Sequence, residues 1–210
     1  MGPVWTPSES RAAGSRLAAF ATAQGLDGYE ALHAWSVEDP GAFWAAAWDA
    51  CGLVGERADR AFVPGATLPE ARFFPEARLN VVETFLATTG AGPALVEAGE
   101  DGRRRTLRWD ELRSQVAALA AVLAETGVGP GHRVAAWLPN IPETIVTMLA
   151  TAAVGATFSS TSPDFGTAGV LDRFGQVQPT VLMAADGYVY GSRANDCLPR
   201  LAEIRAGLPS

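Results

Sequence analysis

The sequence contains no lysine: all 16 of its basic residues are arginine. A chain without lysine cannot form a Schiff base, and it cannot supply the lysine of a Walker-type phosphate loop. Any chemical step that needs an ammonium group on a flexible side chain must therefore come from outside these residues.

Cysteine and positive charge are also scarce. Cys51 and Cys197 lie too far apart for a metal-ligand motif, so we expect free thiols, and nothing indicates an oxidising compartment. The net charge is -7, and a broad basic surface that would attract phosphate backbones is not expected. Nucleic-acid binding is therefore not predicted.

Long apolar runs are missing as well. The most apolar stretch, from Thr144 to Phe158, is shorter than the ~20 residues that cross a bilayer. The N-terminus lacks the charged start and apolar run of a signal peptide. We therefore expect a soluble, cytoplasmic protein with no membrane partner, and its 48% hydrophobic residues predict a sizeable core.

The first part of the chain predicts helices. Helical spacing of apolar residues covers Ser8 to Gln24 and Asp27 to Trp35, and a third helix is expected to start with Asp39 as its cap and Pro40 in its first position. The aromatic residues of the second and third helices are expected to pack against one another and not to form a ligand cage. These residues are Trp35, Phe43, Trp44 and Trp48. Residues 65–78 are expected to be an irregular connection.

The second part predicts an α/β fold. After a helix over 79–88 and a hairpin around Gly99 to Gly102, strands alternate with helices. The expected strands cover 133–138, 156–160 and 180–184, and the expected helices cover 110–126, 142–154, 165–177 and 198–206. This order predicts a helical segment over 1–78, followed over 79–210 by a partial doubly wound, mainly parallel sheet with flanking helices.

The predicted sheet has unpaired edges, so a further strand is expected beyond the last helix. The sequence is therefore predicted to be the front part of a larger enzyme. His33 and His132 have no nucleophile at a recognisable spacing, and we interpret both as structural residues.

Two segments are candidates for ligand binding. Ser159 to Gly166 follows a predicted parallel strand and precedes a helix, where open α/β sheets bind ligands. Its hydroxyl and backbone N–H groups suit an anion, but Asp164 is also a good helix cap, and the two interpretations are equally supported. Arg193, after the next strand, is either a phosphate contact or a surface arginine.

At these residues the chain resembles the N-terminal third of an acyl-CoA synthetase of the adenylate-forming superfamily. Within it, the pattern is most similar to the acetoacetyl-CoA synthetase (acetoacetate–CoA ligase) family, because the Ser-Pro-Asp-Phe-Gly run precedes Gly169 to Gly175. The other matching segments are Tyr29 to Trp48, Phe73 to Asn80, Gly127 to Val134, Leu138 to Glu143 and Asp186 to Tyr190.

The resemblance implies a ligase that activates acetoacetate with ATP and Mg²⁺ and transfers it to coenzyme A, with AMP as the leaving product. The phosphate loop, the ribose-binding aspartate and the catalytic lysine of such enzymes lie further along the chain and are not present here. The 210 residues are therefore expected to contain no catalytic residue and to be inactive alone.

The resemblance also implies a partial coenzyme A site. Asp164, Phe165 and Gly166 match the loop that lines the coenzyme A entrance, and Arg193 matches an arginine that contacts its nucleotide phosphate. Tyr190 stands where relatives have a second arginine, so the phosphate contact differs here.

Two alternatives stay open at this level. The first is that the parent enzyme uses another short acid such as acetate, propionate or butyrate, since the acid pocket is built later in the chain. The second is that the chain is a non-catalytic module that binds coenzyme A or a partner protein, with the aromatic helices available for self-association.

Overall fold

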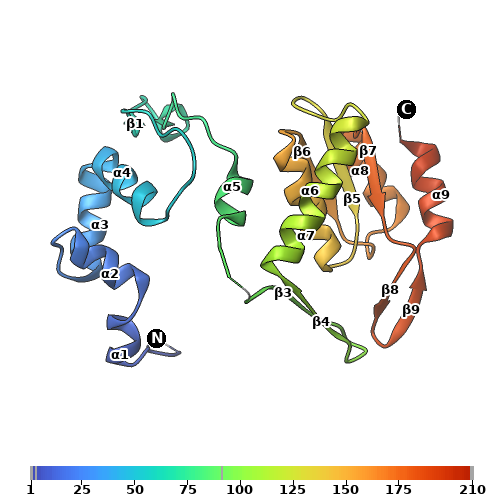
Figure 1. Ribbon diagram of the computed structural model, residues 1–210, viewed down its shortest axis with the longest axis horizontal. Helices are drawn as coiled ribbons and strands as arrows, with labels where there is room; N and C mark the ends of the chain where they lie inside the picture. The colour runs from blue at the N-terminus through green and yellow to red at the C-terminus, as the bar shows by residue number, and fades with distance from the viewer. Residues whose placement is uncertain (1, 3, 91, 209–210) are drawn as a thin grey trace. The chain divides into compact units, whose positions relative to one another are not determined.

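The computed structural model describes residues 2, 4–90 and 92–208 (Figure 1). The chain divides into two compact units, residues 1–79 and residues 80–210, and each is described by itself.

The first unit is built on four helices: α1 (Glu9–Ala13), α2 (Arg16–Ala23), α3 (Gly28–Glu38) and α4 (Pro40–Ala50). The prediction of one continuous helix over Ser8 to Gln24 is wrong, because the chain breaks between α1 and α2. The side chain of Ser15 accepts a hydrogen bond from the Ala18 N–H at 3.1 Å and so starts a new helix.

The predicted start of α4 is confirmed. The Asp39 carboxylate accepts a hydrogen bond from the Ala42 N–H at 2.9 Å, and Pro40 occupies the first helical position. The aromatic residues pack against one another, with ring centroids 5.5 Å apart for Trp35 and Phe43 and 4.9 Å apart for Trp48 and Phe74.

Residues 65–78, predicted to be irregular, contain the short 3₁₀ helix η1 (Leu68–Glu70) and β2 (Arg72–Phe73), and β1 (Phe62–Val63) lies just before them. The two strands pair antiparallel, with Phe62 opposite Phe73. Strands of two residues are too short to leave a periodic signal in the sequence, which explains why the prediction missed them.

The second unit begins with α5 (Val81–Leu86) and an antiparallel hairpin of β3 (Pro93–Ala98) and β4 (Arg104–Arg108). Strands β5 (Arg133–Trp137), β6 (Thr157–Thr161) and β7 (Val181–Ala184) then alternate with helices. The helices are α6 (Trp109–Glu125), α7 (Pro142–Ala153), α8 (Thr167–Val177) and α9 (Leu198–Gly207). The three strands form a parallel sheet in the order β6-β5-β7.

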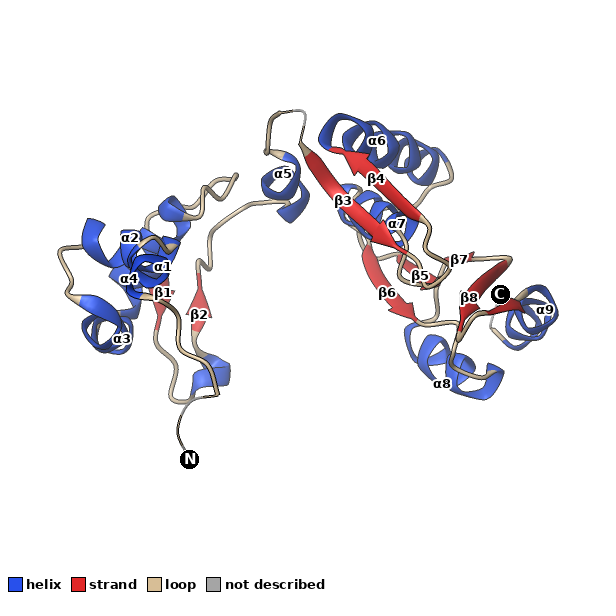
Figure 2. Cartoon of the chain, turned by 90° about the horizontal axis from the view of Figure 1, so that it is seen from below, coloured by secondary structure: helices blue, strands red, loops and turns tan. Residues whose placement is uncertain are grey.

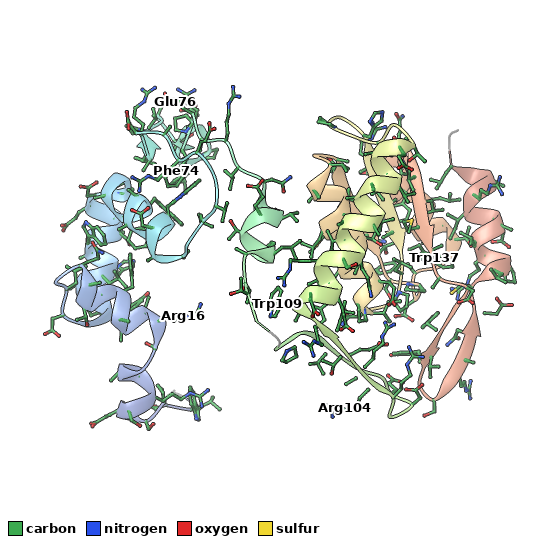
Figure 3. All side chains as sticks on the ribbon, in the orientation of Figure 1. Arg16, Phe74, Glu76, Arg104, Trp109 and Trp137 are labelled. Atoms are coloured by element: carbon green, nitrogen blue, oxygen red, sulfur yellow. The ribbon has the colours of Figure 1, made fainter. Side chains whose placement is uncertain are left out.

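Helices cover both faces of this sheet, which confirms the doubly wound prediction (Figure 2). Val134 of β5 joins a core with α6 and α7, and the next residue, Ala135, joins the core on the opposite face with α8 and α9. Successive strand residues point to opposite faces, so the central strand is buried on both sides. Trp137 at its end is completely buried (Figure 3).

Two further predictions need correction. Helix α8 begins at Thr167 and not at Phe165, and the segment after β7, where no strand was predicted, is a hairpin of β8 (Gly187–Tyr190) and β9 (Arg193–Asp196). Gly191 and Ser192, with φ of 56° and 61°, make the tight turn that joins the two strands. No helix within the described residues is long and apolar enough to cross a bilayer.

Candidate functional site

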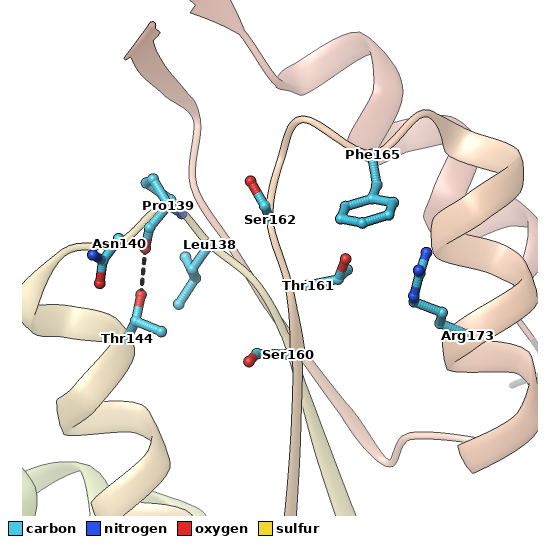
Figure 4. Close-up of a pocket in the computed structure, with 9 residues that line it drawn as sticks. All are labelled: Leu138, Pro139, Asn140, Thr144, Ser160, Thr161, Ser162, Phe165 and Arg173. Atoms are coloured by element: carbon cyan, nitrogen blue, oxygen red, sulfur yellow. Dashed lines mark hydrogen bonds between the residues drawn. The ribbon is translucent and has the colours of Figure 1, made fainter. Parts of the chain in front are cut away.

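The candidate site lies at the carboxyl ends of β5 and β6. The chain leaves β5 toward α7 on one face of the sheet and leaves β6 toward α8 on the other face. A crevice opens between adjacent parallel strands wherever their connections diverge in this way. Here the crevice is an open pocket of about 440 Å³ (Figure 4).

Polar groups dominate one side of the pocket. Ser160, Thr161 and Ser162 line it from β6 and the loop that follows, and Asn140 lines it from the end of β5. Thr144 at the start of α7 is fixed by its hydroxyl, which donates to the Pro139 carbonyl at 2.7 Å (Figure 4).

Thr161 carries a buried hydroxyl with no hydrogen-bond partner among the described residues, although its side chain lines the pocket. An unpaired buried hydroxyl is costly, and the cost is removed when a ligand or water supplies a partner. Thr161 therefore contributes a buried, unsatisfied hydroxyl to the wall of the pocket.

The charge of the pocket comes from arginine. Arg173 of α8 lies over the ring of Phe165, with its guanidinium carbon 4.0 Å from the ring centroid. None of the lining residues is Asp or Glu. A stacked guanidinium without a facing carboxylate favours an anionic or strongly polar ligand.

The loop between β6 and α8 holds three of the predicted site residues together. Within it, the Ser162 hydroxyl and the Asp164 carboxylate are hydrogen-bonded at 2.8 Å, and the Phe165 N–H donates to the Ser162 carbonyl at 3.2 Å. Asp164 is not the helix cap, which is Gly166 without any side-chain hydrogen bond. The carboxylate of Asp164 is hydrogen-bonded to Ser162 and not to the N-terminus of α8, so the interpretation of Asp164 as a helix cap is wrong.

Arg193 lies apart from the pocket lining, at the start of β9 and opposite Tyr190 of β8. Its side chain is exposed, and no ion pair to it occurs within the described residues. The turn beside it is held by Glu100 of the β3–β4 hairpin, whose carboxylate accepts the Gly191 N–H at 2.7 Å. Arg193 is therefore presented to solvent on a hairpin, not within a loop at the sheet edge.

Tyr188 of β8 links this hairpin to the loop. Burial raises the pKa of Tyr188, the neighbouring Asp164 carboxylate raises it further, and the guanidinium of Arg200 lowers it. Tyr188 and Arg200 were not predicted as site residues. Tyr188 falls within the Asp186–Tyr190 segment of the family resemblance and Arg200 belongs to no motif, but only the tertiary fold brings both residues to the loop at Asp164.

Comparison with known proteins defines the class. Residues 82–208 match the family model of AMP-binding enzymes, and residues 29–84 match that of the acetyl-coenzyme A synthetase N-terminus. The first match covers more than half of the chain, so the chain belongs to the AMP-binding enzyme family.

Within that family, similar proteins include several acetoacetyl-CoA synthetases. The chain is 48% identical to acetoacetyl-coenzyme A synthetase of Rhizobium meliloti over 98% of its length and 38% identical to acetoacetyl-CoA synthetase of Rattus norvegicus over 91%. The solved acetoacetyl-CoA synthetase from Streptomyces lividans superposes on all of the chain with a TM-score of 0.91 and 42% identity. The chain spans about a third of each of these proteins, 33%, 30% and 34% respectively.

Proposed function

We propose that the chain is part of an AMP-forming acid–CoA ligase that acts on acetoacetate. Acetoacetate attacks the α-phosphorus of ATP and gives acetoacetyl-adenylate and pyrophosphate. The thiol of coenzyme A then attacks the acyl carbon, loses its proton and displaces AMP to form the thioester. The observation that carries this proposal is the similarity to acetoacetyl-CoA synthetases along nearly the whole chain, in sequence and in fold.

Within that reaction, we assign the described residues to coenzyme A and not to adenylation. Asp164, Phe165 and Gly166 line the path of coenzyme A, and Arg193 contacts its nucleotide phosphate. The exposed guanidinium of Arg193 and the cationic pocket beside Phe165 support this assignment. Tyr190, paired with Arg193 across the hairpin, lies on the same end of the hairpin and provides a hydroxyl or a ring there.

The two compact units correspond to two proposed domains. Residues 1–78 form the N-terminal segment of an acyl-CoA synthetase, and residues 79–210 form the first part of the AMP-binding domain. The division of the chain between residues 79 and 80 supports these limits, and the two family-model matches meet a few residues further on, at residues 82–84.

Mg²⁺ is proposed only as a companion of ATP. Among residues 2, 4–90 and 92–208, no three His, Cys, Asp or Glu side chains lie close enough to hold a metal ion. Mg²⁺ is commonly bound through substrate phosphates and one or two carboxylates, so it needs no cage in this part of the protein. The free thiols of Cys51 and Cys197 support a reducing, cytoplasmic setting.

Acetoacetate-dependent exchange of pyrophosphate into ATP tests the proposal. The full-length gene product is expected to catalyse this exchange, and the 210 residues alone are not, since they contain no lysine. Exchange by the 210 residues alone would overturn the assignment of adenylation to residues outside them.

Acetate is the alternative acid, because residues 29–84 match the acetyl-coenzyme A synthetase N-terminus. Exchange measured with acetoacetate, acetate, propionate and butyrate distinguishes the candidates. If kcat/KM is higher for acetate than for acetoacetate, the proposed substrate is acetate and not acetoacetate.

A further inference from the structure

The loop that carries Asp164, Phe165 and Gly166 is exposed between two anchored ends. The three residues themselves are exposed, whereas Pro163 before them is completely buried. An exposed loop keeps one conformation only if its ends are held by contacts to rigid elements. Both ends of this loop contact the same element, helix α9.

The first anchor is Arg200 in the first turn of α9. Its Nη1 donates to the Pro163 carbonyl at 3.2 Å, and its guanidinium carbon lies 5.5 Å from the centre of the buried Trp137 ring. The guanidinium is thus held between the end of β5 and the backbone of the loop. A planar, permanently charged group is well suited to such a stacked and hydrogen-bonded position.

The second anchor is Glu203, one helical turn further along α9. Its carboxylate accepts a hydrogen bond from the Thr167 hydroxyl at 2.9 Å. Thr167 is the first residue of α8, directly after Gly166. Arg200 and Glu203 are three residues apart and therefore lie on the same face of α9, where they contact the two ends of one loop.

Helix α9 is itself rigidly packed. Ile204 and the cap residue Cys197 are completely buried in the core shared with α8. At Gly207 an added Cβ would lie 2.8 Å from the Leu171 side chain, which shows how closely the two helices approach. Helix α9 therefore has a fixed position, and its contacts with the loop hold the two ends of the loop in fixed positions as well.

From these contacts we infer that α9 fixes the coenzyme A loop from both sides, and that Arg200 and Glu203 are positioning residues for coenzyme A binding. The inference about the ligand rests on the proposed function. The inference about the loop rests on the contacts alone, and the two are separable by experiment.

Amide hydrogen exchange in the ligand-free full-length gene product tests the clamp. Arg200→Ala and Glu203→Ala are expected to speed exchange of the amides of residues 164–168 roughly fivefold, the effect of losing one hydrogen bond. Glu203→Gln keeps an acceptor and should restore slow exchange. Arg205→Ala removes an exposed arginine of the same helix and serves as the matched control. Unchanged exchange in both alanine variants would overturn the clamp, whatever the ligand.

The dissociation constant of coenzyme A tests the positioning role in the same proteins. It should rise roughly fivefold in Arg200→Ala and Glu203→Ala and stay unchanged in the control Arg205→Ala. Arg193→Ala should weaken coenzyme A binding without changing amide exchange in the loop. Faster amide hydrogen exchange in the loop of these variants, with an unaltered affinity for coenzyme A, would overturn the positioning role. Failure of the unsubstituted protein to bind coenzyme A would instead overturn the proposed function, and with it the ligand half of the inference.

Discussion

Arg105 of β4 and Glu143 in the first turn of α7 form a two-point ion pair. Nη1 lies 2.7 Å from Oε1 and Nη2 lies 2.6 Å from Oε2, while the Nε of Arg105 donates to Glu97 at 2.8 Å. One arginine therefore joins both strands of the hairpin to the helix that starts beside the pocket. Geometry of this kind is the strongest that a surface ion pair adopts.

Substitution of Arg105 by alanine is expected to lower the free energy of unfolding of the second unit by about 1 kcal/mol. The value is modest because the Arg105 and Glu143 side chains are 38% and 48% exposed. Denaturant unfolding of the full chain measures the change. Arg104→Ala removes the same charge from the neighbouring position, and an equal loss in that variant would show that the ion pair contributes nothing specific.

The loss of folding stability at acidic pH should depend on Glu143. The hydrogen bond and charge of Arg105 lower the pKa of Glu143 below that of an ordinary glutamate. A lowered pKa in the folded state stabilises the protein above the unfolded pKa of about 4.3, and this stabilisation is lost as the pH falls through the folded pKa. Glu143→Gln should therefore be less stable at neutral pH and lose less stability on acidification below about pH 4.3. Parallel stability–pH curves for the two proteins would contradict this.

Two glycines should respond to alanine in opposite directions. At Gly65 a Cβ would lie 2.5 Å from the backbone carbonyl carbon of Glu70, so Gly65→Ala is expected to destabilise the first unit by about 1–3 kcal/mol. At Gly175, inside α8, a Cβ meets nothing within 4 Å, and alanine should stabilise by about 0.5–1 kcal/mol through helix propensity. Thermal unfolding followed by circular dichroism measures the sign of both stability changes. A lower unfolding midpoint for Gly175→Ala than for the unsubstituted protein would refute the predicted stabilisation.

The two thiols should react at very different rates. Cys51 is exposed, whereas Cys197 is completely buried and burial raises its pKa. Because the thiolate is the reactive species, a thiol reagent such as dithionitrobenzoate should modify Cys51 rapidly and Cys197 only after unfolding. Cys51→Ser provides the control, since it should abolish the fast phase. Rapid modification of that variant would show that Cys197 is accessible in the native state.

The sequence was sufficient to predict the long helices and the buried strands, and insufficient to predict the short strands outside the parallel sheet. Helix α6 and strand β5 carry clear periodic or buried patterns, and Asp39 with Pro40 marks the start of α4 by local chemistry alone. The four-residue strands of the β8–β9 hairpin lack the continuous apolar run that marks the equally short strand β7.

The site was predicted in the same uneven way. The loop at Asp164 to Gly166 was found because it follows a parallel strand, a rule that depends only on element order. Arg173 and Arg200 were not found, since each approaches the loop from a different helix through tertiary packing. Long-range contacts of this kind have no signature in local sequence.

Formation of acetoacetyl-CoA is the most direct test of the central claim. The full-length gene product, given acetoacetate, ATP, Mg²⁺ and coenzyme A, should form the thioester and AMP in equal amounts, with pyrophosphate released. Release of ADP in place of AMP, or thioester formation with acetate and none with acetoacetate, would contradict the claim that this chain belongs to an AMP-forming acetoacetate ligase.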